Sequence, residues 1–311
     1  MPVYSPDNIL CDYDFMIVAS TYGNEILELI HKNNISMEKV CFIHVPFGPQ
    51  IDIAKNYSKI KNHIDVAVAT QIEGYRELAD NYVKKDKLLY NQLNKRKSMH
   101  ADDINDDFYF TDKFDNAGTV SNYFWQDLWA ARLIHENAPE KHFDIGSRVD
   151  GFIAHLLSFR KEVFLIDIRP LPYEVDGINF VQGDATNLNE IPDESIESLS
   201  ALCSLEHFGL GRYGDPIDPE ACFKAFDAIQ RKIKSGGFAY ISVPIGREHV
   251  EFNGCRIFYA KTVLDAFNQM ELQQLDAASS GKIEYNIDIH KYDTDTRKRA
   301  NIYGLFVLKK K

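Results

Sequence analysis

The sequence predicts an α/β protein whose larger part is a doubly wound, mostly parallel sheet of seven strands. β-like runs alternate with helix-like runs over residues 141–311, which is typical of parallel strands joined by right-handed crossovers. A separate strand–helix–strand pattern near the start of the chain predicts a small N-terminal α/β domain. The 311 residues suffice for one large domain with a smaller one beside it.

Composition and charge restrict the classes of function. The chain holds 35 Lys and Arg against 46 Asp and Glu, a formal net charge of −11, which repels phosphate backbones, so we expect no nucleic-acid partner. Apolar runs are too short for a membrane span, and the first residues lack the pattern of a secretory signal. The five cysteines are scattered without a C-x-x-C pair, so we expect reduced thiols, a cytoplasmic protein and no zinc site.

Residues 1–97 make up the predicted N-terminal domain. It begins with a β-like run at 15–20, a helix-like run at 24–33 and a β-like run at 40–45. Gly23 is the single glycine after the first strand, so the glycine fingerprint of a nucleotide site is missing. The segment resembles the small α/β appendages of bacterial surface-polysaccharide enzymes. We expect a structural or homo-oligomerising role for it, with a second binding site as the alternative.

An acidic linker is predicted at residues 98–119, after a basic, helix-prone run at 84–97. Charge blocks of this kind are typical of a solvated connection. A cation-binding loop is the alternative, but such loops also need a turn glycine and a closing glutamate at set spacing, and both are missing. The clustered acids are Asp102, Asp103, Asp106 and Asp107.

An amphipathic helix at residues 120–137 is expected to open the large domain, residues 120–311. Ser121 or Thr119 is placed to cap it. Its apolar residues recur at helical spacing, and we expect this stripe to pack into the core rather than to hold a ligand. The stripe comprises Val120, Phe124, Leu128, Ala131 and Ile134, widened by Trp125 and Trp129.

The remaining elements of the large domain follow from the same alternation. The expected strands lie at 142–145, 163–167, 178–181, 196–200, 238–243, 271–275 and 303–308. The expected helices lie at 152–159, 219–232 and 260–270. Because open α/β sheets bind ligands at the carboxyl ends of their strands, the residues that follow the strands are the candidates for a site.

Three motifs follow the first three of these strands. D-I-G-S at 144–147 places a glycine between a strand and a helix, where unpaired backbone N–H groups and the helix dipole favour a ligand. Asp167 ends the next strand, about 20 residues later, and is placed to accept hydrogen bonds from two ribose hydroxyls. G-D-A at 183–185 supplies a further acid, which can accept a hydrogen bond from an adenine amino group.

Together with P-D-E-S-I-E at 192–197 and K-S-G-G at 234–237, these motifs resemble the class I S-adenosylmethionine-dependent methyltransferases over residues 141–311. The resemblance implies a Rossmann-like methyltransferase fold and S-adenosylmethionine as cofactor, with its methionine part at the first turn. Arg148 and Asp150 stand where the family has its second and third glycines. The expected cofactor-binding residues are Asp144, Gly146, Ser147, Asp167, Ile168, Asp184 and Ala185.

Three longer strings resemble an uncharacterised bacterial methyltransferase-like family, a domain of unknown function associated with surface-glycan loci. They are DIGSRVDGFIAHL at 144–156, LEHFGLGRYGDPIDP at 205–219 and SVPIGREHVEFNGCRIF at 242–258. The second string contains a literal G-x-G-x-x-G at 209–214, but it follows the fourth strand of the domain, and Asp215–Pro216 breaks any helix after it. We interpret it as a loop over the active-site end of that strand, not as a dinucleotide fingerprint.

Glu206 and His207 end the fourth strand, the place that faces the sulfonium methyl group in the methyltransferases that the chain resembles. We expect His207 to accept the proton of the acceptor, and Glu206 to orient it or to serve as an alternative base. His249 and Glu251, after the fifth strand, are close enough in topology to join them. The alternatives are that Glu206 and His207 bind the cofactor or cap the next helix, or that they hold a divalent cation; no dedicated metal spacing is present.

Polar side chains near the same strand ends are the expected substrate-binding residues. Arginines there suit a phosphate or carboxylate group, and salt bridges that fix the loops are the alternative. The candidates are Arg212, Tyr213, Asp215, Arg247 and His249.

The sequence therefore leads to one functional hypothesis and two rivals. The hypothesis is S-adenosylmethionine-dependent O-methyl transfer to a small polar acceptor, a hydroxyl of a sugar or nucleotide-sugar in bacterial surface-polysaccharide synthesis. One rival is a methyltransferase that acts on a macromolecule. The other is a non-catalytic module that binds the cofactor or a partner enzyme.

Overall fold

The structure is a computed structural model that describes residues 16–19, 40–44, 84–102, 117, 120–159, 162–296 and 301–311. The chain divides into two compact units, residues 1–117 and 118–311. In the first unit, β1 (Met16–Ala19) and β2 (Val40–His44) pair in parallel, which confirms the predicted parallel pairing. The helix expected at 24–33 and most of the acidic linker lie outside the described residues.

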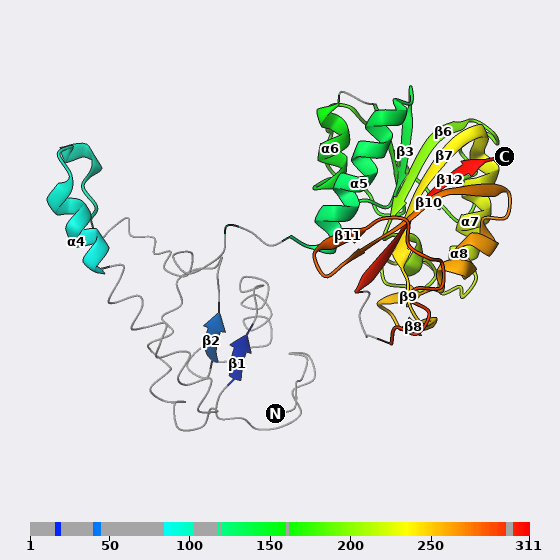
Figure 1. Ribbon diagram of the computed structural model, residues 1–311. Coiled ribbons are helices and arrows are strands. Elements are labelled where there is room, and N and C mark those ends of the chain that lie inside the picture. Colours follow the sequence, from blue (N-terminus) through cyan, green and yellow to red (C-terminus); the bar gives the residue numbers. More distant parts are fainter. Residues whose placement is uncertain are drawn as a thin grey trace. The chain divides into compact units, whose positions relative to one another are not determined.

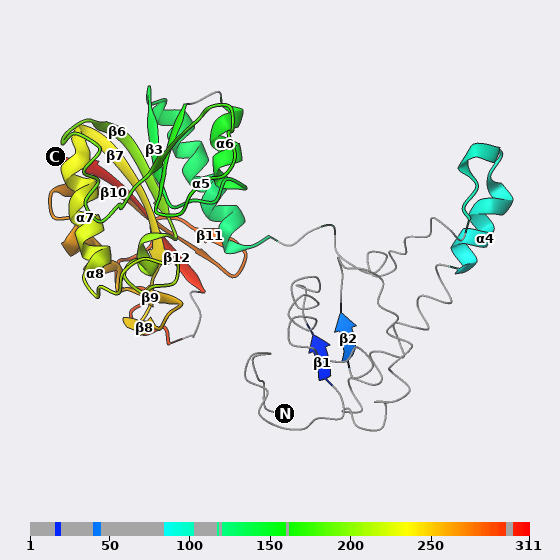
Figure 2. The same ribbon diagram turned by 180° about the vertical axis from the view of Figure 1, so that it is seen from behind.

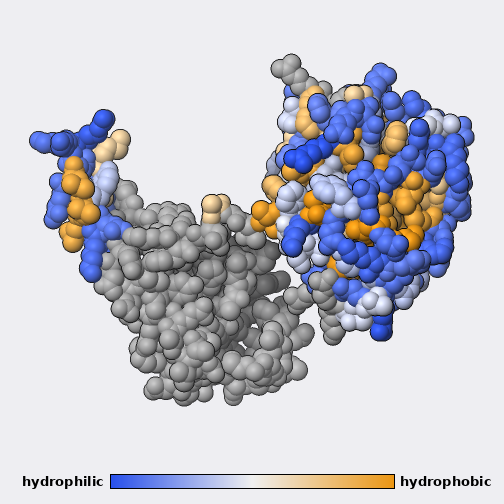
Figure 3. Space-filling view, viewed as in Figure 1, coloured by the Kyte–Doolittle hydropathy of each residue, from blue (hydrophilic) through white to orange (hydrophobic). Residues whose placement is uncertain are grey.

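The basic run forms α4 (Lys84–Leu93), followed by a 3₁₀ turn, η5 (Lys97–Met99). Leu88, Leu89 and Leu93 of α4 are exposed and form a hydrophobic patch on its surface (Figure 3).

The second unit is built on an eight-stranded sheet in the order β11-β10-β12-β7-β6-β3-β4-β5. Its first five strands along the chain are parallel to one another, and β12, β10 and β11 add antiparallel pairs next to β7, at one edge. The predicted α/β class and mostly parallel, Rossmann-like sheet are confirmed. The strands are β3 (His142–Ile145), β4 (Val163–Asp167), β5 (Ile178–Gln182), β6 (Ile196–Leu202), β7 (Ile233–Pro244), β10 (Met270–Ser279), β11 (Lys282–Glu284) and β12 (Ile302–Lys310).

The predicted count of seven strands was one short. The additional strand, β11, is only three residues long and pairs antiparallel with the end of β10 across a turn at Ser280 and Gly281. Three residues are too few to show the alternation by which strands are recognised in a sequence. A short hairpin of β8 (His249–Glu251) and β9 (Cys255–Ile257), outside the main sheet, was missed for the same reason.

Helices cover both faces of the sheet (Figures 1 and 2). On one face lie α5 (Asn122–Asn137) and α6 (Phe152–Ser158), and on the other lie α7 (Ala221–Lys232) and α8 (Ala260–Ala266). Each face has its own hydrophobic core, the larger one built around Phe226, Phe258, Phe267 and Phe306. Burial of such large apolar surface is the main force that holds the three layers together.

For helix α5, the apolar periodicity of the sequence predicted part of the buried face wrongly. Ser121 caps the helix as predicted, since its Oγ accepts a hydrogen bond from the Phe124 N–H at 3.3 Å. Val120 and Phe124, however, are 48% and 47% exposed, so the expectation that they pack into the core was wrong. The inner face instead includes Gln126, whose Oε1 accepts hydrogen bonds from Ser242 and Cys203. A buried polar residue with satisfied partners is invisible to an apolar pattern.

Candidate functional site

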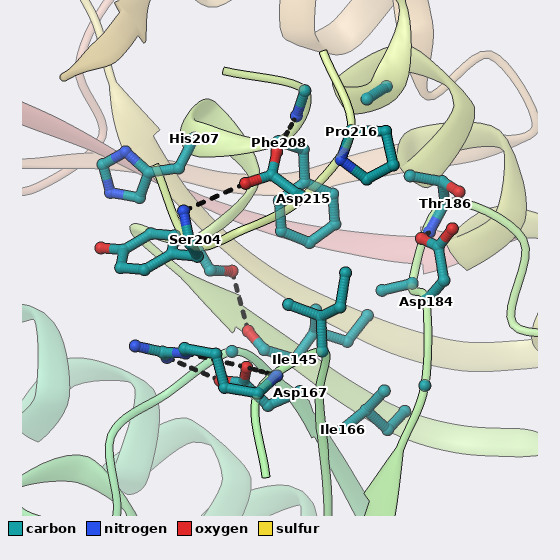
Figure 4. Close-up of a pocket in the computed structure, with 18 of the residues that line it drawn as sticks. Ile145, Ile166, Asp167, Asp184, Thr186, Ser204, His207, Phe208, Asp215 and Pro216 are labelled. Carbon is teal, nitrogen blue, oxygen red and sulfur yellow. Dashed lines mark hydrogen bonds and ion pairs between the residues drawn. The ribbon is translucent and has the colours of Figure 1, made fainter. Parts of the chain in front are cut away.

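A cavity opens where the carboxyl ends of β3, β4 and β5 meet the segment that follows β6. It encloses about 830 Å³ of space, including open solvent at its mouth. In Figure 4, Ile145, Ile166 and Asp167 line one side and His207, Phe208, Asp215 and Pro216 line the opposite side, with Asp184 and Thr186 at one end. A ligand in it would be held between the strand ends and the loop at residues 208–218, which we call the roof loop.

The register of the sheet brings the predicted motifs together. Ile145 pairs with Ile166, and Asp167 pairs with Gln182, so the residues that follow the three strands share one edge. The sequence-predicted residues that line the cavity are Gly146, Asp167, Ile168, Asp184, Ala185, His207, Tyr213 and Asp215. The structure does not bring Asp144, Ser147, Glu206, Arg212, Arg247 or His249 to the cavity wall.

Gly146 makes the turn after β3 possible. Its φ of +78° is in the left-handed region, and a Cβ at this position would lie 2.9 Å from the Cβ of Ser204. Backbone can therefore approach the cavity here in a way that a side chain would prevent.

Asp144 lies beneath this turn and supports it. Its side chain is fully buried, accepts a 2.5 Å hydrogen bond from the Ser200 hydroxyl and accepts one from the Ser147 N–H at 3.1 Å. The ring of His142 adds hydrogen bonds to Ser198 and Ser200. Burial raises the pKa of Asp144 to about 6. The structure shows Asp144 fixing the glycine turn from the inside, and its contact with a cofactor stays a prediction.

Asp167 is engaged by a residue that sequence reasoning did not single out. The Arg169 guanidinium donates to both carboxylate oxygens at 3.0 and 2.7 Å, and the Arg169 N–H donates to Oδ1 at 2.8 Å. The same guanidinium lies 4.5 Å from the centre of the Tyr213 ring. Arg169 thus connects the end of β4 with the roof loop across the cavity.

The roof loop is organised by Asp215. Its carboxylate accepts hydrogen bonds from the N–H groups of Gly209, Gly211 and Tyr213 at 2.7, 3.3 and 3.1 Å. Gly209, Gly211 and Gly214 all have positive φ, so the G-x-G-x-x-G string serves a turn-rich loop between η7 (Leu205–His207) and α7, as interpreted from its position. Asp215 lines the cavity, but its oxygens are directed at its own loop.

Replacing Gly209 by alanine is expected to destabilise the protein by about 2–4 kcal/mol, because the residue carries both backbone strain and a clash. A Cβ there would lie 1.8 Å from the carbonyl oxygen of Asp218. Gly214→Ala is the matched control: its φ is +81° but a Cβ would meet nothing within 4 Å, so only about 1 kcal/mol is expected. Urea unfolding of both variants measures the difference, and equal losses would contradict this account.

Glu206 and His207 form a pair in which His207 lines the cavity and Glu206 is buried beside it. Glu206 is 2% exposed, and its Oε2 is buried without a hydrogen-bond partner among the described residues. Its Oε1 lies 3.5 Å from His207 Nε2. Burial raises the pKa of Glu206 to about 8 and lowers the pKa of His207 to about 4, with Arg212 contributing to the lowering. Near neutral pH the proton therefore resides on Glu206, and His207 is an uncharged imidazole.

The hydrogen bonds of His207 assign its tautomer. Nδ1 lies 2.6 Å from the carbonyl oxygen of Gly254, which can only accept, so Nδ1 carries the proton. Nε2 is then left with its lone pair. The Arg212 guanidinium donates to the same carbonyl at 3.0 Å. Of the pair, His207 lines the cavity and is the one placed to accept a proton there.

Glu206→Gln is expected to change how stability depends on pH. A carboxyl with a folded pKa above its unfolded one binds more protons in the folded state, so this group makes stability fall as pH rises between about 4.5 and about 8. The glutamine variant lacks this loss and should be more stable than the parent at about pH 8.5, by more than about 1 kcal/mol. Urea unfolding at three pH values measures it; parallel curves for the two proteins would refute the assignment.

The other predicted substrate-binding residues, Arg212, Arg247 and His249, do not line the cavity. Arg212 is exposed and lies 5.2 Å from the centre of the Tyr213 ring, which also packs edge-on against His207. The His249 ring lies on β8, where Nδ1 donates to the Arg247 carbonyl at 2.6 Å. The Arg247 side chain is exposed, and its N–H donates to the Asp295 carbonyl at 2.8 Å.

Sequence reasoning missed most of the remaining wall. Arg169 follows Asp167 by two residues, and Phe208 follows His207 directly, so adjacency to a motif was the one signal for each. Cys203 has a φ of +49°, unusual for a residue other than glycine, which a sequence does not reveal. The missed lining residues are Ile145, Ile166, Arg169, Gly183, Thr186, Cys203, Ser204, Phe208, Gly209, Pro216, Asp218 and Ala221.

The model of a protein family described as "Caenorhabditis protein of unknown function, DUF268" matches residues 179–311. No curated protein matches the chain.

Several solved structures are similar at low identity. The N-methyltransferase NodS of Bradyrhizobium japonicum, in complex with S-adenosylhomocysteine, is 12% identical, with a TM-score of 0.41 over 72% of this chain and 97% of that one. The 1,6-didemethyltoxoflavin-N1-methyltransferase of Burkholderia thailandensis is 14% identical, with a TM-score of 0.41 over 60% and 78%. A TehB-like methyltransferase of Corynebacterium glutamicum is 17% identical, with a TM-score of 0.40 over 63% and 90%. These similarities are too distant to assign a substrate.

Two further observations concern the described residues alone. None of their helices has both the length and the apolar character that crossing a membrane requires. Nor do three or more His, Cys, Asp or Glu side chains in the described ranges converge as metal ligands would.

Proposed function

We propose that this protein transfers a methyl group from S-adenosylmethionine to a small polar acceptor. The observation that carries the proposal is the cavity itself: Asp167 and Asp184 follow adjacent parallel strands on one side, and an uncharged His207 faces them from the other. A diol and an aromatic amino group are the ligand parts that two such carboxylates recognise.

The wall of the cavity fits an adenosine-bearing cofactor. Gly146 provides close approach to the backbone, and Ile166, Ala185 and Phe208 supply apolar surface for a planar base. Asp184 accepts a hydrogen bond from the Thr186 N–H at 2.9 Å, which holds its carboxylate at the end of the cavity. Asp167 and Ile168 would hold the ribose, Asp184 and Ala185 the adenine, and the turn at Gly146 and Ser147, supported by Asp144, the methionine part.

For methyl transfer the protein mainly has to align the acceptor with the methyl group and remove the proton of the acceptor. When bound, S-adenosylmethionine supplies an electrophilic methyl group on a positively charged sulfur. Nε2 of His207 accepts the proton of the acceptor as the new bond forms, and the neighbouring Glu206 carboxyl, 3.5 Å from Nε2, orients the ring. This step puts a positive charge on His207 only during the transfer, because burial and Arg212 keep it neutral beforehand.

For the acceptor, we propose a hydroxyl of a sugar or nucleotide-sugar, as in bacterial surface-polysaccharide synthesis. Support comes from the sequence resemblance and from the exposed guanidinium of Arg212 beside the cavity-lining Tyr213, since a guanidinium suits a phosphate or carboxylate. Tyr213, Asp215, Arg247 and His249 complete the proposed acceptor region. We further propose that the protein acts in the cytoplasm. Residues 1–97 form a domain that mediates self-association, and residues 98–119 link this domain to residues 120–311. Sedimentation of the full chain tests the self-association.

The decisive experiment combines calorimetry and turnover. Titration with S-adenosylmethionine and with S-adenosylhomocysteine is expected to give saturable binding to one site. A panel of sugars and nucleotide-sugars is then incubated with cofactor labelled in its methyl group. Lack of binding at millimolar cofactor would overturn the proposal, and binding without transfer to any acceptor would favour the non-catalytic module, which the engagement of Asp167 by Arg169 also supports.

A further inference from the structure

The β8–β9 hairpin contacts the proposed active site through its turn and through β9. Gly254, in the turn, offers its carbonyl oxygen to both His207 Nδ1–H and Arg212, at 2.6 and 3.0 Å. The turn is tight: the Gly254 N–H donates to the Glu251 carbonyl, and a Cβ on Gly254 would lie 3.0 Å from that oxygen. The position of this one carbonyl therefore decides which nitrogen of His207 carries the proton.

Two residues further on, Arg256 of β9 reaches the same region from the inside. Its side chain is buried, with 6% exposed. Nη1 donates to the carbonyl oxygens of Phe208 at 2.5 Å and Glu206 at 3.3 Å, and Nη2 donates to that of Pro219 at 3.2 Å. The guanidinium thus contacts η7 at Glu206, the start of the roof loop at Phe208 and the residue after its end, Pro219.

The partners of Arg256 are unusual for a buried cation. Among the described residues its guanidinium forms no ion pair within 4 Å, and its hydrogen bonds go to backbone carbonyls. Burying a charge is costly unless its donors are satisfied. A planar guanidinium directs several donors at fixed angles, whereas a lysine ammonium is a single compact point that cannot reach carbonyls on both sides in the same way.

We propose that Arg256 is a positioning residue for His207: through β9 and the roof loop it holds the imidazole against the Gly254 carbonyl, in the tautomer that is protonated at Nδ1 and leaves the lone pair on Nε2. The inference rests on the proposed function in that His207 is taken as the base. It gives a role to the G-C-R-I-F end of the third sequence string, residues 254–258, which lies outside the cavity wall.

The first test needs no substrate and no variant of Arg256. Nuclear magnetic resonance of the full chain with isotope-labelled histidine reports the protonated nitrogen of each ring, and His207→Gln assigns the signal. The expected result is a neutral ring protonated at Nδ1. A ring protonated at Nε2 would overturn the proposal.

The second test is Arg256→Lys, which keeps the positive charge but loses the planar guanidinium and its directed N–H donors. We expect the signal of His207 to change to a mixture of tautomers and kcat to fall by about 10²-fold, while the affinity for cofactor stays close to that of the parent. Arg231→Lys is the matched control, since Arg231 also donates to a backbone carbonyl, that of Asn187, but lies exposed on α7. This variant should change neither the His207 signal nor kcat.

An Arg256→Lys protein with the parental tautomer and turnover would overturn the proposal. If the parent transfers no methyl group but the tautomer responds to Arg256 as expected, the positioning role stands and the proposed function fails. If Arg256→Lys does not fold, the measurement on the parent protein still decides whether Gly254 sets the tautomer.

Discussion

Replacing His207 by alanine is expected to lower the rate of methyl transfer by about 10²–10⁴-fold, the usual contribution of a general base. His207 lines the cavity, and with Nδ1 bonded to the Gly254 carbonyl its Nε2 is the nitrogen left to accept a proton. Binding of S-adenosylmethionine should change little, because Asp167 and Asp184 lie on the opposite side and at the end (Figure 4). Single-turnover rates together with calorimetry on the same preparation measure both quantities.

A histidine elsewhere on the unit provides the control for this variant. His290 is exposed, pairs with Asp293 at 2.8 Å and does not line the cavity. His290→Ala should leave transfer and binding unchanged. Transfer by His207→Ala at the parental rate would remove His207 from the mechanism, whereas loss of cofactor binding would assign His207 to the cofactor site.

Asp167→Asn is expected to weaken cofactor binding by about 10–100-fold, since hydrogen bonds to a charged group contribute about 1.5–3 kcal/mol. The complication is Arg169, which loses its partner in the same variant. Arg169→Met separates the two effects, because it breaks the ion pair but keeps the carboxylate.

The two variants should affect the affinity for the cofactor differently. In the parent, Arg169 occupies lone pairs of Asp167 that a ribose diol also needs, so removing the guanidinium should maintain or raise affinity while Asp167→Asn lowers it. Calorimetric titration of each variant with S-adenosylhomocysteine measures this. Equal losses would mean that the ion pair matters for its structure alone and that Asp167 does not contact the ligand.

Much of the large domain was predictable because its strands are strongly marked. The predicted strands at 142–145 and 163–167 coincide with β3 and β4. The fifth expected strand, 238–243, is longer in the structure, since β7 begins at Ile233 before the glycine pair. Gly236 and Gly237 read as a turn in sequence, but the ladder between β6 and β7 continues past a register shift there.

The candidate site was predictable to the extent that it depends on chain order. Parallel strands align their carboxyl ends at one edge, so acids that follow consecutive strands must come close together. This reasoning placed Gly146, Asp167 and Asp184 correctly at the cavity. It did not distinguish Asp144, which points inward, because alternation along a strand sets the side of the sheet but not the partners on that side.

The sequence by itself determined the α/β class, the positions of the main strands and the acids and glycine at their ends, since these follow from local periodicity and turn chemistry. Only the tertiary structure decided which groups are available and in which protonation state. Arg169 engages Asp167, Gly254 selects the tautomer of His207, and burial leaves a proton on Glu206. The physical reason is that hydrogen bonds and desolvation depend on atoms far apart in the chain, 47 residues between His207 and Gly254, and no local pattern encodes those contacts.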